Sequence, residues 1–132
     1  MTEALGDSPT MRSFVEQAQE AAGLSSFEEA DALVRATLNT LAESVTGGQV
    51  DELAEGLPKE LRNELNRRSG QARSMDRTGF LDRVSGAVQT TDLERTEQEV
   101  RAVLRTVRQW APRGETPDTM QQLPSSIAEL FR

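Results

Sequence analysis

Two stretches of the chain carry apolar side chains at every third or fourth position, the spacing that places them on one face of an α-helix. In the first stretch these positions are Phe27, Ala30, Val34, Leu38, Leu41 and Val45. In the second they are Leu93, Val100, Val103, Leu104 and Val107. The pattern predicts two long amphipathic helices whose apolar faces form a core, with Leu38 and Leu104 buried in it. Trp110 flanks the second stripe and is expected at the edge of that core.

Both long helices carry start and stop signals. The segments Ser25-Ser26-Phe27-Glu28 and Thr91-Asp92-Leu93-Glu94 fit the capping box, in which a hydroxyl binds the helix N-terminus and a carboxylate binds back. Gly47-Gly48 and Pro112-Arg113-Gly114 follow the apolar stripes with residues that do not readily extend a helix. The long helices are therefore predicted to begin at these caps and to end before these glycines.

Shorter helices are predicted around the long ones. Ser8-Pro9 is typical of a helix start, because Pro is favoured at the first helical position after a capping Ser, and it predicts a helix over 9–23. The remaining predicted helices cover 49–55, 58–67, 75–88, 117–122 and 124–131. No segment shows sustained alternation of apolar and polar residues, so no strand is predicted.

The two halves of the chain align with each other without a gap when one is shifted along the other by a constant number of residues. We call this shift, which pairs Phe14 with Phe80, the repeat offset. Other aligned pairs are Val34–Thr40 with Val100–Thr106, and Leu57-Pro58 with Leu123-Pro124. Caps, turns and core positions recur together, as they do in repeat proteins. The predicted fold is all-α, with two tandem four-helix repeats packed as an eight-helix bundle. The repeats cover 9–67 and 75–132, after an N-terminal tail over 1–8, and a basic linker over 68–74 joins them.

These caps, turns and core positions also resemble a known family. Four segments are similar to a bacterial family, frequent in actinobacteria, that is catalogued as domain of unknown function 2267. They are the helix led by Phe14, the core segment Arg35-Ala36-Thr37-Leu38, the Gly47-Gly48 stop and the segment Leu57-Pro58-Lys59-Glu60-Leu61. The resemblance extends to the chain end, from Leu123-Pro124 to Leu130-Phe131. The second copy departs from the family pattern at Ser125-Ser126, which replaces a charged pair. The family has no established activity, so the resemblance implies a fold and no catalytic residue.

Composition limits the classes of function. With 36% hydrophobic and 28% charged residues, the chain has the balance of a folded globular protein. No apolar run reaches the roughly 20 residues that span a bilayer. The acidic N-terminal segment lacks the basic and then apolar layout of a signal peptide. A cytoplasmic protein that does not enter a membrane is therefore expected.

Missing residue types narrow the chemistry. The sequence contains no Cys, His or Tyr, which removes the thiolate nucleophile and the commonest general base and transition-metal ligand. Asp51, Glu52 and Glu55 lie close together, but they lack the spacing of a calcium loop and suit a first helical turn. No catalytic residue, cofactor or metal is predicted, and a carboxylate-based enzyme or metal protein is the least favoured class.

Three arginines share one flank of the second long helix. Arg101, Arg105 and Arg108 stand at helical spacing, and they are candidate contacts for an anion or an acidic partner. The competing interpretation is electrostatic: Glu94 and Glu97 precede them, which complements the helix dipole, and Glu97 lies four residues before Arg101, the favourable orientation for an ion pair. That interpretation is the favoured one.

A second basic cluster lies at the junction of the two predicted units, where Arg67, Arg68 and Arg73 could contact phosphates. A solvated linker is the simpler interpretation. Residues 1–66 hold 13 acidic and 4 basic residues, a net charge of −9, and residues 67–132 hold 9 and 11, a net charge of +2. No aromatic residues are interleaved with these arginines for base stacking.

The sequence therefore favours a non-enzymatic scaffold or protein-interaction module with an unidentified protein partner. The alternative is a nucleic-acid-associated accessory protein that uses the Arg-rich junction and the second unit, and nucleic acid is the less expected partner because the whole chain carries a net charge of −7.

Overall fold

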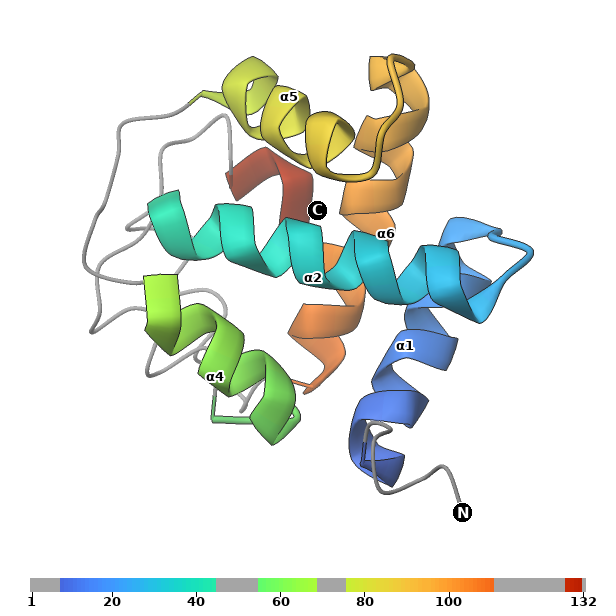
Figure 1. The fold of residues 1–132 in the computed structure, drawn as a ribbon, viewed down its shortest axis with the longest axis vertical. Helices are drawn as coiled ribbons and strands as arrows, with labels where there is room; N and C mark the ends of the chain where they lie inside the picture. Colours follow the sequence, from blue (N-terminus) through green and yellow to red (C-terminus); the bar gives the residue numbers. More distant parts are fainter. Residues whose placement is uncertain (1–7, 45–54, 69–75, 111–127, 132) are drawn as a thin grey trace.

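The computed structural model describes residues 8–44, 55–68, 76–110 and 128–131, and every regular element in those ranges is helical (Figure 1). The elements are α1 (Pro9–Ala22), α2 (Phe27–Ser44), α4 (Lys59–Arg68), α5 (Arg77–Ala87), α6 (Leu93–Trp110) and the short 3-10 helix η2 (Glu129–Phe131). The predicted all-α class is confirmed. None of the described helices is both long and apolar enough to cross a membrane.

The eight predicted α-helices are not all found. The described residues form five α-helices, each starting close to a predicted start. The predicted helix over 49–55 lies outside the described residues apart from its last residue, and the one over 117–122 lies wholly outside. Of the helix predicted over 124–131, the structure describes Ala128 and η2. The three residues of η2 have the tighter 3-10 geometry and not the predicted α-helical one. The predicted Gly and Pro stops at 47–48 and 112–114 also lie outside.

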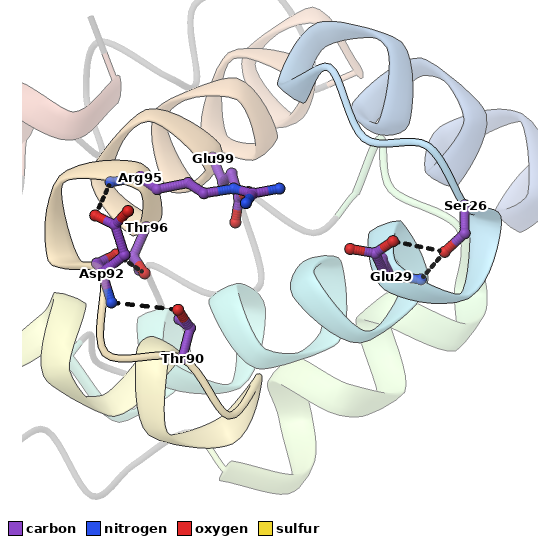
Figure 2. A network of polar contacts seen from close by, with 7 residues as sticks. All are labelled: Ser26, Glu29, Thr90, Asp92, Arg95, Thr96 and Glu99. Atoms are coloured by element: carbon purple, nitrogen blue, oxygen red, sulfur yellow. Dashed lines mark hydrogen bonds and ion pairs between the residues drawn. The ribbon is translucent and has the colours of Figure 1, made fainter.

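Local chemistry explains where the helices begin. Ser8 caps α1 as predicted, with its hydroxyl accepting a hydrogen bond from the Met11 amide at 3.2 Å. The capping residues of the two long helices are Ser26 and Asp92, one position later than the predicted Ser25 and Thr91. The capping side chain must reach the amide three residues ahead. Ser26 reaches the amide of Glu29, and Asp92 reaches the amide of Arg95 (Figure 2).

Several local features recur at the repeat offset. Helices α2 and α6 are both 18 residues long and start at Phe27 and Leu93. The turns before them each contain one left-handed residue, Gly23 with φ 69° and Gln89 with φ 60°. In each turn the next amide donates to the carbonyl five residues earlier, Leu24 to Gln19 at 3.0 Å and Thr90 to Ser85 at 2.9 Å.

The core is shared by helices from both halves of the chain. Helix α1 packs on α6, and α2 packs on α1, α4, α5 and α6, as its central position in Figure 1 shows. The largest fully buried side chains include Phe14, Phe80 and Phe131, one from each of α1, α5 and η2. Leu38 and Leu104 are both completely buried, which confirms that prediction. The described helices of the first half, α1, α2 and α4, and those of the second half, α5, α6 and η2, therefore bury their apolar faces in one core.

Candidate functional site

The arginine flank of α6 binds the C-terminal turn of the same chain. The Arg101 guanidinium donates to the Glu129 carbonyl at 2.9 Å, and the Arg108 guanidinium donates to the Phe131 carbonyl at 2.9 Å. Both acceptors belong to η2. Carbonyl groups at a helix end lack partners within the helix, so these arginines satisfy groups that would otherwise need water.

The ion pair predicted on the same flank, between Glu97 and Arg101, is confirmed. Arg101 forms an ion pair with Glu97, four residues earlier, at 3.0 Å. Arg77, at the start of α5, lies 3.9 Å from Glu97 and 4.0 Å from the Glu129 carboxylate, so it links the acid on α6 to the acid on η2. Arg105, the third predicted contact residue, is exposed. Two of the three candidate arginines therefore hold the chain end, a role that helical spacing alone did not indicate.

The basic junction is described only at its start. Helix α4 continues through Arg68, so Arg67 and Arg68 belong to its last turn, and the predicted boundary between unit and linker at 67/68 falls inside a helix. Arg73 lies outside the described residues. Of the predicted acidic cluster, Glu55 is exposed, and Asp51 and Glu52 lie outside. Within the described ranges, no three acidic, His or Cys side chains gather as metal ligands.

Trp110 lies at the edge of the core, as predicted. It is partly buried, and its ring meets that of Phe14 edge to face, with the centroids 5.3 Å apart. Its indole N–H donates to the Gln17 side chain at 2.9 Å. Because both contacts are with α1, the residue joins the end of α6 to the first helix.

Glu60 also joins two elements, and its pKa is altered. Its carboxylate accepts from the Ser8 amide at 2.7 Å and from the Ser8 hydroxyl at 3.1 Å, which ties α4 to the start of α1. Partial burial acts to raise the pKa of this carboxyl, but the hydrogen bonds from Ser8 stabilise the ionised form and leave the pKa below its ordinary value. The contact serves the packing of the two helices.

A groove of about 430 Å³, not predicted from the sequence, lies between the two helical turns. One wall comes from the α1–α2 turn and α2, and consists of Leu24, Glu28, Glu29, Ala32 and Leu33. The other comes from the end of α5, its turn and the start of α6, and consists of Ala87, Val88, Gln89, Thr90, Arg95 and Glu99. We call this feature the inter-turn groove. Its two walls are segments that correspond to each other at the repeat offset.

The polar residues of the inter-turn groove form two local networks. The Arg95 guanidinium pairs with the Glu99 carboxylate at 2.9 Å, and the Ser26 hydroxyl and the Glu29 carboxylate lie 3.1 Å apart. Figure 2 shows Arg95 and Glu29 extending toward one another from α6 and α2. Thr90, on the α5–α6 turn, accepts from the Asp92 amide at 3.2 Å and so holds the second wall in shape.

The sequence contains one signal for this groove, a difference in residue type between the two segments that form its walls. Several apolar and capping positions match at the repeat offset, but Leu33 corresponds to Glu99 and Glu29 corresponds to Arg95. Leu33 and Glu99 occupy equivalent helical positions, but one side chain is apolar and the other is acidic. At this place the two halves of the chain share their local fold and differ in side-chain chemistry.

The described fold defines an all-α protein whose two long helices cross at a shared core and leave a groove of polar and apolar side chains between their N-terminal turns. The family described as "Uncharacterized conserved protein (DUF2267)" matches residues 11–130, so the chain belongs to this family. The resemblance seen in the sequence is thereby confirmed. A comparison with curated proteins finds no match.

Proposed function

We propose that this protein is a non-enzymatic protein-interaction module and that the inter-turn groove is its docking site. The observation that carries the proposal is the composition of the groove. Leu24 and Val88 are only partly buried and line the groove together with the buried Leu33, so apolar surface is accessible among its polar side chains. Protein–protein contacts commonly combine such an apolar area with polar groups around it.

The ionisable groups of the groove support a binding role over a catalytic one. They are three glutamates and one arginine, and the arginine is paired with one of the glutamates. The sequence has no His, Cys or Tyr that could be added to them as a base, nucleophile or proton donor. Catalysis here would depend on carboxylates alone.

We also propose that the chain is a tandem repeat whose two units superpose after a rigid rotation. Support comes from the equal lengths of α2 and α6, from the paired left-handed residues Gly23 and Gln89, and from two buried threonines. Thr40 and Thr106 each donate to the carbonyl four residues earlier, at 2.8 and 3.0 Å. The inter-turn groove would then lie near the axis that relates the units. An experimental structure in which α1–α2 and α5–α6 did not superpose would refute this arrangement.

The docking proposal is tested by filling the groove. Ala32 is an exposed α2 residue on its wall, so Ala32→Trp adds a large side chain there without changing the core. Ser13→Trp, at an exposed α1 position that does not line the groove, is the matched control. Proteins retained from an extract of the source cells by the wild type and by Ser13→Trp should be lost with Ala32→Trp, and the purified partner should show the same difference by calorimetry. Equal retention by all three would refute the proposal.

Nucleic acid has less support as the partner. Arg101 and Arg108 donate to backbone carbonyls, and the groove holds more acidic than basic side chains. Non-specific binding grows with the number of phosphates neutralised, so we expect no appreciable binding of mixed-sequence DNA or RNA at about 0.15 M salt. A polarisation titration checks this. Micromolar binding that is abolished when Arg67, Arg68 and Arg73 are changed to Glu would favour the nucleic-acid function instead.

A further inference from the structure

We propose that the inter-turn groove binds a basic side chain, lysine or arginine, of a partner protein, with Glu99 as its main anchor. This inference rests on the proposed function and adds the chemistry of the partner. The groove contains the carboxylates of Glu28, Glu29 and Glu99 and the guanidinium of Arg95, a net charge of −2. A cation that enters it is therefore attracted by the surrounding charge.

Glu99 is the carboxylate with the least access to water. Its side chain is only 12% exposed, whereas the side chain of Arg95, its ion-pair partner, is 64% exposed. The carboxylate thus lies beneath a long side chain that is largely in solvent. Because the Arg95 guanidinium is largely in solvent, a cation that brings further contacts can take its place on Glu99, and the carboxylate then keeps a charged partner.

The fold does not require an acid at this position. Its counterpart at the repeat offset, Leu33, lines the opposite wall and is 2% exposed. A leucine therefore satisfies the equivalent site in the first half of the chain. Placing a carboxylate in such surroundings carries a desolvation cost, and a cationic occupant would offset that cost more fully than the exposed Arg95 does.

The walls beside Glu99 suit a peptide better than a bare cation. Leu24 and Val88 present apolar surface that fits the aliphatic stem of a lysine or arginine and an adjacent apolar side chain. Gln89 holds a left-handed conformation, φ 60°, in which glycine would be less strained, and it is one of the residues that line the groove. A glutamine side chain can both donate hydrogen bonds to the main chain of a bound peptide and accept them from it.

The test uses two synthetic peptides, acetyl-Gly-Leu-Arg-Leu-Gly-amide and its analogue with citrulline, a neutral isostere, in place of arginine. Each is titrated into the isotope-labelled full chain, and the backbone amide shifts report both the affinity and the site. The arginine peptide should shift amides of the groove walls. Loss of a charged hydrogen bond should weaken the citrulline peptide about tenfold.

Three variants make the test specific. Glu99→Gln should weaken the arginine peptide about tenfold, since it removes the anchoring charge. Glu94→Gln, which removes an equal charge from an exposed α6 position outside the groove, should leave its affinity unchanged. Arg95→Gln removes the internal competitor and should tighten binding by up to about fivefold. The amide spectra of the free variants verify that each is folded.

Equal affinity of the two peptides, or an unchanged affinity in Glu99→Gln, would overturn the inference. So would spermidine binding the groove as well as the arginine peptide, which would identify a small cation as the occupant, or groove shifts that grow with protein concentration alone, which would identify a second copy of the chain. If both peptides bind the groove equally, the proposed function still stands. Equal retention of partners by Ala32→Trp would refute the proposed function whatever the peptides do.

Discussion

The burial of Leu38 and Leu104 leads to a prediction with a definite magnitude. Both side chains are completely inaccessible to solvent, one on α2 and one on α6. Replacement by Ala removes three carbon atoms, which is about 2.4 kcal/mol at roughly 0.8 kcal/mol for each. The cavity that remains adds to this, so each single variant should lose about 2–5 kcal/mol of unfolding free energy. That loss is a large share of the roughly 5–15 kcal/mol typical of a whole domain.

The measurement is urea unfolding followed by far-ultraviolet circular dichroism, with thermal melts in parallel. For a chain of this size each kcal/mol should lower the Tm by about 3–5 °C. Leu93→Ala is the matched control, because Leu93 is on α6 as well but is 37% exposed, so that variant should lose about 1 kcal/mol or less. If Leu38→Ala and Leu104→Ala unfolded within error of the parent, the assignment of both stripes to one core would be wrong.

Three further predictions follow from the packing. Residues 1–66 expressed alone should fold poorly, since α1 and α2 pack on α6 and α5, and a cooperative melt near that of the full chain would contradict this. Phe131→Ala should cost about 3–5 kcal/mol by urea unfolding, because this C-terminal side chain is fully buried, and a wild-type midpoint would contradict its place in the core. Glu60→Gln should lower stability at neutral pH. Because the folded-state pKa of Glu60 is lowered, its contribution is present above the unfolded-state pKa of about 4.3 and is lost as the pH falls through the folded-state value. Unfolding curves at several pH values should therefore converge for variant and parent in acid, and a constant gap would refute the linkage.

Among the features of this chain, helix identity and burial were the most predictable from the sequence. The apolar stripes identified α2 and α6 and placed Leu38 and Leu104 in the core, because helical period and burial are imposed by neighbours three and four residues away. The caps were displaced by one residue, to Ser26 and Asp92, since adjacent polar residues compete for the same role and only the backbone geometry selects one. The chain end was less predictable, because η2 takes a 3-10 form that its sequence does not distinguish from an α-helix.

The tertiary structure alone decided what the side chains of the candidate sites contact. The sequence placed Arg101 and Arg108 on one flank of a helix, but it did not indicate that the carbonyl groups of η2 would lie against that flank. The inter-turn groove likewise exists only because the turns before α2 and α6 come together in the folded chain. Local signals determine where a helix begins and which face is apolar, because they act within a few residues along the chain. The partners of a polar flank and the shape between two turns depend on how separate helices pack, and that arrangement is set by the whole core.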